Sequence, residues 1–311
     1  MDRIKIKNKN SLYNAPINYF TRPVDRAFMA VVYFFLIVIT LCIMLPVTHI
    51  LAASVSSPSA VSTGKVYFWP VEFTLEGYIR IIQTSNITRG LRNTIFYTAL
   101  GTVINIIVTV LAAYPLSRKD IKGRNVFMWI FVITMLFNGG MVPTYLVVSG
   151  LGLVDSVWAM VLPGALSVYL MIICRTYFQE NIPRELYECA SMDGCRDATF
   201  LVRIAIPLSK PILAVLVLLY AVGHWNSYFS ALLYLRRAEM VPLQLVLRDI
   251  LITGGGGSVD INDVADQLKR EYMRNLLQYS IIVFSTIPIL LLYPVIQKYF
   301  IRGIMIGALK G

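Results

Sequence analysis

Residue types that perform acid–base, nucleophilic or metal chemistry are scarce in this chain. Its 311 residues include two histidines, His49 and His224, and four cysteines. Cys189 and Cys195 lie close together in the sequence, but no histidine accompanies them, as a typical zinc site of such spacing would require. We therefore expect no catalytic residue and no metal site.

A run of four glycines at 254–257 is the only stretch that resembles a phosphate-binding loop. It lacks the Gly-Lys-Ser/Thr that completes such a loop, so we expect a flexible linker instead. The chain thus carries no recognisable site for ATP hydrolysis, and we expect it to bind no cofactor.

The most informative polar segment, 181–207, lies between two long apolar runs. Asn181 and Pro183 suit the start of a helix, and Gly194 suits its end because glycine readily adopts the left-handed conformation. Pro207 is expected to turn the chain into the next apolar run. We predict a bent, two-part helix whose apolar residues pack on the rest of the protein or fill a groove in a partner. These apolar positions are Leu186, Ala190, Phe200, Leu201 and Ile204.

The composition predicts a membrane protein. Hydrophobic residues make up 57% and charged residues 14% of the chain, against about a half and a quarter in soluble domains. Six uncharged apolar runs are each close to the ~20 residues that a helix needs to cross hydrocarbon. Backbone groups in lipid must be satisfied within the segment, so we predict an all-α integral membrane fold with six transmembrane helices. The runs are 27–50, 93–116, 126–148, 156–174, 211–235 and 276–297.

Basic residues set the expected orientation, because cytoplasmic loops retain Lys and Arg. They gather in the N-terminal tail, in 117–124, in 175–203 and near the C-terminus, whereas 149–155 has none. Both termini and segment 181–207 should lie in the cytoplasm, with 52–92 and 236–275 outside. The net charge of +11 follows from this topology, and its spread over helix flanks argues against nucleic-acid binding.

We expect one membrane domain with short tails. Residues 1–26 form a cytoplasmic N-terminal tail, 27–302 the six-helix domain with its loop 181–207, and 303–311 a cytoplasmic C-terminal tail. In the two outer segments, 73–82 and 261–272 have the spacing of short helices.

The spacing within 181–207 resembles the signature loop of binding-protein-dependent ABC importer permeases. The family pattern is Glu-Ala-Ala, three residues, Gly, nine residues, Ile, one residue, Leu-Pro. The chain has Glu188-Cys189-Ala190, Gly194, Ile204 and Ile206-Pro207, with Cys for Ala and Ile for Leu as departures. Segments 137–145, 224–229 and 293–311 resemble the carbohydrate (maltose-type) branch, and within it the subgroup for complex oligosaccharides and polysaccharide fragments.

That resemblance implies a type I ABC importer fold in which segment 181–207 is a coupling helix that docks in a cleft of an ATPase subunit. It implies a second permease in a heterodimer, two ATP-binding subunits that carry ATP and Mg²⁺, an extracytoplasmic solute-binding protein and a carbohydrate substrate. The location would be a bacterial cell membrane. The residues assigned to ATPase coupling are Glu188, Cys189, Ala190, Asp193, Gly194, Ile204 and Pro207.

For the solute path we favour the fifth apolar run and its neighbours. Flat aromatic faces suit sugar rings, and amides at membrane depth supply hydrogen bonds. Aromatic residues at helical spacing also serve packing, so this alternative stays open. The residues chosen are Asn138, Trp225, Asn226, Tyr228, Phe229 and Tyr234.

Three other functions are compatible with a six-helix membrane protein. An ion-coupled secondary transporter of a small polar solute needs charged residues at midplane, which the six runs lack. An intramembrane enzyme needs a paired nucleophile and base, or metal ligands, at that depth. A purely structural membrane subunit stays open, and purification with an ATPase partner would exclude it. The importer permease is therefore the favoured hypothesis.

Overall fold

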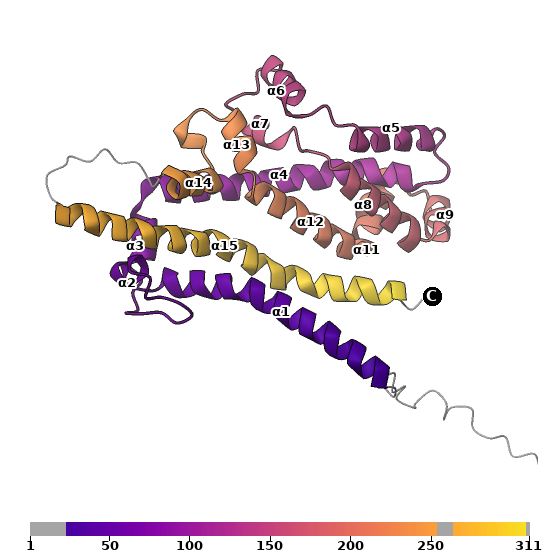
Figure 1. Cartoon of the computed structure of the whole chain (residues 1–311). Helices are drawn as coiled ribbons and strands as arrows, with labels where there is room; N and C mark the ends of the chain where they lie inside the picture. Colours follow the sequence, from indigo (N-terminus) through magenta and orange to yellow (C-terminus); the bar gives the residue numbers. More distant parts are fainter. Residues whose placement is uncertain (1–22, 254–263, 309–311) are drawn as a thin grey trace, which may run out of the picture.

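The computed structural model describes residues 23–253 and 264–308, and all regular elements in these ranges are helical (Figure 1). The predicted all-α fold is confirmed for this part of the chain. The glycine run 254–257 and most of the predicted tail 1–26 lie outside the described residues.

Three helices within 23–253 and 264–308 are long and apolar enough to cross a membrane. They are α1 (Pro23–Ser54), α4 (Ser85–Ser117) and α15 (Val264–Ala308), the last with its apolar stretch at 271–294. Two bent pairs raise the number of candidate spans in the described ranges to five: α5 (Arg124–Leu136) with α6 (Met141–Gly150), and 197–208 with α12 (Lys210–Trp225).

The predicted run 156–174 is not one helix in the structure. It is divided into α7 (Val157–Val161) and α8 (Val168–Asn181), with a non-helical link at 162–167. Pro163 and Gly164 lie in this link and explain the break, because proline removes a backbone donor and glycine is a poor helix former. The Ser167 hydroxyl then caps α8 by accepting from the Leu170 amide at 3.5 Å. The sequence pattern missed this interruption because the link itself is apolar.

The 112° bend between α5 and α6 divides the third predicted run in the same way. Gly140 precedes α6 with a φ of 86°, which favours glycine, and Asn138 accepts a hydrogen bond from its amide at 2.9 Å. The fifth predicted run is also shorter than expected, since α12 ends at Trp225 and α13 (Tyr228–Tyr234) follows as a separate helix.

Short helices occupy the remaining segments. The helix predicted at 73–82 is confirmed as α3 (Glu76–Gln83), whereas the described part of 261–272 belongs to α15 rather than to a separate helix. The other short elements are α2 (Pro58–Ser62), η3 (Ala238–Met240) and α14 (Leu243–Thr253).

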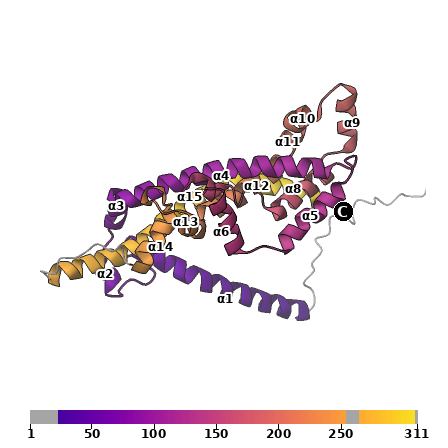
Figure 2. The same cartoon turned by 90° about the horizontal axis from the view of Figure 1, so that it is seen from above.

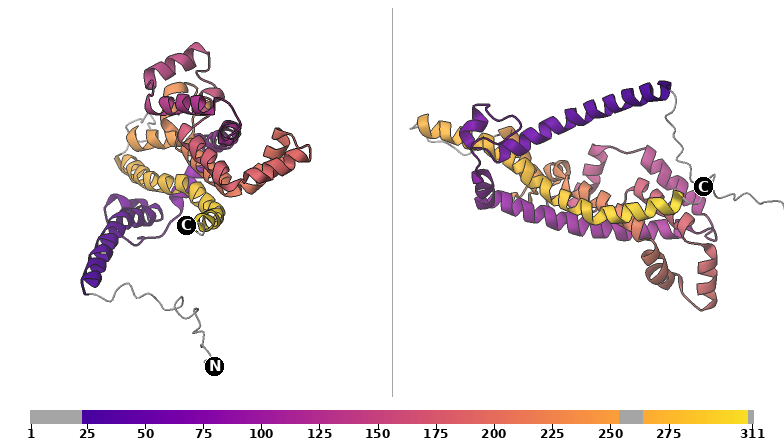
Figure 3. Two further views of the ribbon diagram at one scale, coloured as in Figure 1. Left: turned by 90° about the vertical axis from the view of Figure 1, so that its right-hand side faces the viewer. Right: turned by 90° about the horizontal axis from the view of Figure 1, so that it is seen from below.

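The helices run roughly along one direction, which gives the molecule two ends. Figures 1 and 3 place the start of α1, the loop between α4 and α5, and the C-terminal end of α15 at one end. Helices α2, α3 and α14 lie at the other end (Figure 1). Segments that the charge pattern assigns to one side of the membrane therefore lie together.

The largest hydrophobic cluster lies among α4, α8 and α12 and includes Tyr114, Phe178, Phe200 and Leu216. Helix α1, in contrast, has most of its apolar side chains exposed, as expected for a lipid-facing helix. Close approach of α4 and α12 depends on Gly101, because a Cβ there would lie 2.4 Å from the His224 imidazole. The core thus holds α4 against the helices on both sides of segment 181–207.

Candidate functional site

Segment 184–208, which we call the protruding element, projects from the helical bundle (Figures 2 and 3). It consists of α9 (Arg184–Met192), α10 (Asp197–Phe200), the π-helical turn η2 (Leu201–Ala205) and α11 (Ile206–Leu208). The predicted two-part helix is therefore present, although its second part changes from α to π geometry before Pro207.

The turn within the protruding element lies where the glycine predicts it. Helix α9 ends at Met192, and Gly194 follows in the left-handed conformation with a φ of 77°. The Cys195 amide donates to the Ala190 carbonyl at 2.9 Å, which satisfies one of the free carbonyls at the helix end.

The start of α9 differs from the prediction. Asn181 is the last residue of α8, where its side-chain amide donates to the Tyr177 carbonyl at 3.1 Å, and it does not cap α9. Pro183 holds the cap position with an extended backbone. The 83° bend into α12 lies at Ser209, two residues after Pro207, and the helical run 197–208 continues through Pro207.

The two halves of the protruding element differ in burial. No residue of α9 is buried, and Met192 is 88% exposed. Phe200 and Leu201 are buried in the hydrophobic cluster, with Ala190 and Ile204 packed against it, whereas Leu186 is exposed. The second half is thus built into the core, and the first half presents a free surface.

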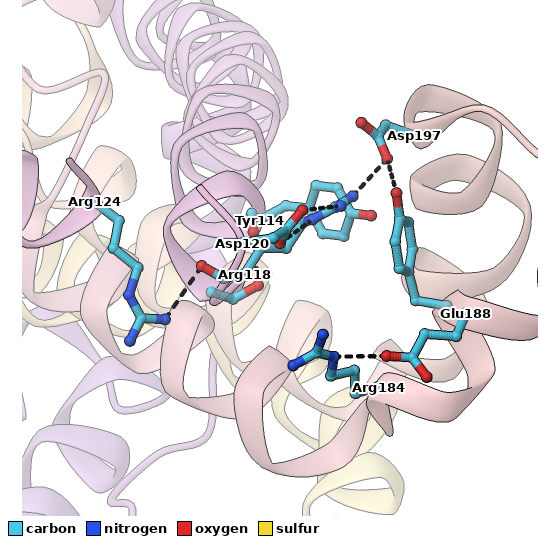
Figure 4. Close-up of polar contacts among 9 residues, drawn as sticks. Tyr114, Arg118, Asp120, Arg124, Arg184, Glu188 and Asp197 are labelled. Atoms are coloured by element: carbon cyan, nitrogen blue, oxygen red, sulfur yellow. Dashed lines mark hydrogen bonds and ion pairs between the residues drawn. The ribbon is translucent and has the colours of Figure 1, made fainter. Parts of the chain in front are cut away.

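Four of the seven residues predicted for ATPase coupling lie on this exposed surface or at its turn. Glu188, Cys189, Asp193 and Gly194 are exposed, and Glu188 pairs with Arg184 one helical turn away at 2.8 Å (Figure 4). Ala190 and Ile204 are half-buried, and Pro207 is exposed on the short helix α11.

A polar cluster that sequence reasoning missed joins α4 to the protruding element. The guanidinium group of Arg118 forms ion pairs with Asp120 and Asp197, and its Cζ lies 3.8 Å from the centroid of the Tyr187 ring. The Tyr187 hydroxyl donates to Asp197 at 2.7 Å. Figure 4 shows Arg118 and Asp120 at the end of α4, facing Asp197 of α10.

Hydrogen bonds shift the pKa values in this cluster. The Tyr187 hydroxyl, followed by Arg118, lowers the pKa of Asp197, and the hydrogen bonds from Arg118 lower the pKa of Asp120. Both carboxylates therefore stay ionised at neutral pH and keep Arg118 paired.

A second candidate site is a cavity of about 530 Å³ between α4, α6, α7, α8, α12 and α13, which we call the polar cavity because neutral polar groups stand among its apolar lining residues. None of the described residues that line it is Asp, Glu, Lys or Arg. Hydroxyl, amide, phenol and imidazole groups line it instead, which suits hydrogen bonding to an uncharged group. The polar lining residues are Asn105, Thr144, Ser167, Tyr220, His224, Ser227, Ser230 and Tyr234.

Hydrogen bonds hold several of these side chains in place. Asn105 donates to the Gly164 carbonyl at 3.1 Å, and the Tyr220 hydroxyl bonds with Thr109 at 2.6 Å and accepts from the Ser167 amide at 3.2 Å. Asn105 could have been found from sequence, because a polar residue inside an apolar run is costly unless paired or facing a cavity.

Of the six residues predicted for the solute path, only Tyr234 lines this cavity among the described residues. Tyr234 is buried and stacks on Tyr145, with ring centroids 6.2 Å apart. The Asp155 amide donates to the Tyr234 carbonyl at 2.8 Å, and backbone N–H groups of Arg236 and Arg237 lower the pKa of Asp155. A loop-to-loop contact therefore fixes the end of α13.

The structure places the other five residues elsewhere. Trp225 is buried against α15, where its indole N–H donates to the Ser285 carbonyl at 3.1 Å, so it packs rather than lines the cavity. The Asn226 amide bonds within its own helix, to the Val222 carbonyl at 2.9 Å. Tyr228, Phe229 and Asn138 are exposed.

Comparison with known proteins agrees with this geometry. Residues 105–241 match the family described as "Binding-protein-dependent transport system inner membrane component". A polygalacturonan/rhamnogalacturonan transport system permease protein, YtcP of Bacillus subtilis, is 40% identical, with 92% of this chain and 99% of the relative covered. Protein LplC of the same organism is 39% identical, with 86% of this chain and 89% of the relative covered.

A solved structure is also similar. A chain of a bacterial ABC transporter involved in the import of the acidic polysaccharide alginate has a TM-score of 0.82 and 37% identity, with 90% of this chain and 99% of that chain covered. Extensive identity over almost the whole length of these relatives goes beyond a shared fold. The chain belongs to the family of binding-protein-dependent inner membrane components, the permease subunits of ABC importers.

Proposed function

We propose that this permease forms the translocation path for an oligosaccharide or polysaccharide fragment, together with a second permease subunit. Substrates of this class are named for its relatives, including polygalacturonan, rhamnogalacturonan and alginate. The observation that carries the proposal is the protruding element, whose motif spacing is complete and whose first helix has no buried residue.

The energy comes from partner subunits in this proposal. Two ATP-binding subunits carry ATP and Mg²⁺, and an extracytoplasmic solute-binding protein delivers the carbohydrate. The permease is not itself an enzyme, in keeping with its family. It lies in the bacterial cell membrane with both termini in the cytoplasm and six spans, the divided segment of α7 and α8 counting as one of them.

The exposed face of α9 would dock in a cleft of an ATP-binding subunit. Glu188 then exchanges its exposed partner Arg184 for a basic residue of that subunit, which costs little because exposed ion pairs contribute about 0–1 kcal/mol. Cys189 and Asp193 belong to the exposed contact surface, Ala190 packs α9 against the core behind it, and Gly194 gives the turn its shape. Ile204 and Pro207 connect it to α12.

Closure of the ATP-binding subunits would move the protruding element and, through it, α4 and α12. Rigid-body rocking of the permease halves then opens the path alternately to the two sides. The polar cavity borders both of these helices, so we place the sugar contacts of this chain there rather than at Trp225. Its uncharged lining would contact hydroxyl groups and ring faces.

The orientation test uses a cysteine that the chain already has. Cys189 is exposed on α9, whereas Cys174 is buried. A membrane-impermeant thiol reagent should label Cys189 in inside-out vesicles but not in right-side-out vesicles. The variant Cys189→Ala, which restores the family residue, is the matched control. Labelling of Cys189 only from outside would contradict the proposal.

The transport test uses the complete complex in proteoliposomes with its binding protein. We expect oligosaccharides of acidic or neutral sugars to stimulate ATP hydrolysis, and the pattern of stimulation identifies the substrate. Hydrolysis that responds to no oligosaccharide, but to a small ion or amino acid, would contradict the assignment.

A further inference from the structure

The geometry points to Arg118 as the positioning residue that transmits movement of α9 to the long helix α4. This inference rests on the proposed function, because it assumes that an ATP-binding subunit moves α9. It adds to that function the contacts of Arg118 with Tyr187 and Asp197, which we call the joint. Arg118 lies at the end of α4, outside the signature motif.

Helix α9 is attached to the body of the protein through few side chains. Only Tyr187 and Ala190 are half-buried, and both pack against the hydrophobic cluster, while the other residues of α9 are exposed. The Tyr187 ring lies beneath the Arg118 guanidinium group and meets Phe200 edge to face, with centroids 5.2 Å apart. A cation over an aromatic face is attracted by the ring quadrupole, so this contact holds α9 against α4.

Arg118 also reaches the second part of the protruding element. Its guanidinium group and the Tyr187 hydroxyl share one carboxylate oxygen of Asp197. Arg118, Tyr187 and Asp197 therefore form a triangle that connects α4, α9 and α10. The side chain of Arg118 is 14% exposed and that of Asp197 is 65% exposed, so the pair lies at the edge of the bundle, where water still reaches the carboxylate.

The α4 side of the joint is firmly held. The Leu116 carbonyl accepts from Arg175 at 2.9 Å, the Ser117 carbonyl from Gln179 at 3.1 Å, and the Arg118 carbonyl from Arg124 at 3.2 Å. These donors satisfy carbonyls that a helix end leaves without partners. A force on the guanidinium group thus acts on an end of α4 that is tied to α5 and α8.

Beside this joint lies a cavity of about 370 Å³, lined by residues that include Ser117, Arg118, Phe178, Arg184 and Glu188. Part of α9 therefore faces open space rather than packed side chains. Arg118 reaches across this gap to Tyr187, so the polar joint gives a force on α9 a direct route to α4. The buried Phe200 gives a second route, which leads from α10 into the core.

The decisive experiment compares Arg118 variants in the reconstituted complex, with transported solute per ATP hydrolysed as the readout. We expect Arg118→Ala to lower this ratio about tenfold, within the range of typical coupling effects, while ATP hydrolysis continues. The ratio for Arg118→Lys should fall between those of the wild type and Arg118→Ala. Lysine keeps the positive charge but lacks the planar guanidinium group with its several N–H donors. Unchanged transport per ATP in Arg118→Ala would overturn the inference.

Two further variants test the joint from the α9 side. Tyr187→Leu removes the aromatic face and should lower the ratio about as much as Arg118→Ala, and the double variant should be little worse than either. Tyr187→Phe keeps the ring but loses the hydrogen bond to Asp197, so its ratio should fall between those of the wild type and Tyr187→Leu. If Arg118→Ala fails to accumulate in the membrane, the comparison of Tyr187→Leu with Tyr187→Phe tests by itself whether the joint transmits movement from α9 to α4. Equal ratios for Tyr187→Leu and Tyr187→Phe would contradict the inference.

Lys122→Ala provides the matched control, since Lys122 is an exposed cation in the same connection between α4 and α5. It should leave the ratio unchanged. Cross-linking of Cys189 to the ATP-binding subunit distinguishes a failure of the joint from a failure of the proposed function. Preserved cross-linking with normal transport in Arg118→Ala would refute only the joint, whereas no cross-link in the wild type would refute the proposed function.

Discussion

Helix α4 makes two kinds of polar contact, one in its middle and one at its end. In the middle, neutral groups pair within the bundle, as Thr109 does with Tyr220 and Asn105 with the Gly164 carbonyl. At the end, Arg118 pairs with carboxylates that are more than half exposed. The charged groups lie at the end of α4, where water reaches the carboxylates. The contacts in the middle use neutral hydrogen bonds, because burying a neutral polar group costs less free energy than burying a charge.

The two regions should also differ in what their disruption affects. Contacts in the middle of α4 are buried, so their loss should lower stability first. The protruding element presents a free surface at the end of α4, so its alteration should impair transport while the fold persists. The following experiments test this distinction, from the largest expected effect to the smallest.

Gly194→Leu should abolish transport without preventing membrane insertion. Gly194 has a φ of 77°, where a side chain costs about 1–2 kcal/mol, although no atom lies within 4 Å of the added Cβ. The turn should therefore change shape rather than clash. Uptake in vesicles and the amount of protein in the membrane are the measurements.

Gly152→Leu is the matched control for this variant, because Gly152 has a φ of 69° and equally open surroundings in the link between α6 and α7. It should keep most transport. Normal uptake by Gly194→Leu would remove the functional distinction between the protruding element and the rest of the molecule.

Gly101→Ala should destabilise the bundle by about 1–3 kcal/mol, because the new methyl group overlaps the His224 ring and forces α4 and α12 apart. Thermal unfolding in detergent measures the loss. Gly150→Ala, at a helical position with nothing within 4 Å, should have little effect. Equal stability of the two variants would show that the middle of α4 is less tightly packed than the structure indicates.

Thr109→Val should lower stability by about 1 kcal/mol, the usual net contribution of a buried neutral hydrogen bond. Tyr220→Phe should cost more, because it also leaves the Ser167 amide without its acceptor. The double variant should cost less than the sum of the two, since both remove the same bond. Unfolding in denaturant measures all three, and strict additivity would contradict a direct Thr109–Tyr220 contact.

The smallest effect near neutral pH concerns Asp197. The pKa of Asp197 is lowered in the folded protein. The ionised carboxylate therefore stabilises the joint fully above the ordinary Asp pKa of about 3.9. This stabilisation is lost as the pH falls through the lower pKa that Asp197 has in the folded protein. Hydrogen exchange of α9 amides, corrected for intrinsic rates, should be constant from pH 8 to 5 and rise only in strong acid. Asp197→Asn should show faster exchange throughout. A rise near pH 6 would implicate another group.

The sequence alone determined the helical membrane class, the short helix predicted at 73–82 and found at 76–83, and the turn at Gly194, and its motif already indicated the permease family. These features depend on residues that are close in sequence, such as an apolar run or a glycine after a helix. Local conformational preference decides them before any distant contact forms. The breaks at 137–140 and 162–167 were missed because helix-breaking residues there sit within otherwise apolar runs.

Only the tertiary structure decided which side chains meet. Arg118 contacts Asp197 across 79 positions, and Thr109 contacts Tyr220 across 111. Trp225 looked like a sugar-binding aromatic, yet the rotation of α12 turns it toward α15. Such contacts depend on how each helix is rotated and how closely the helices approach, as Gly101 and His224 show. No local pattern contains that information, because it arises from packing all the helices at once.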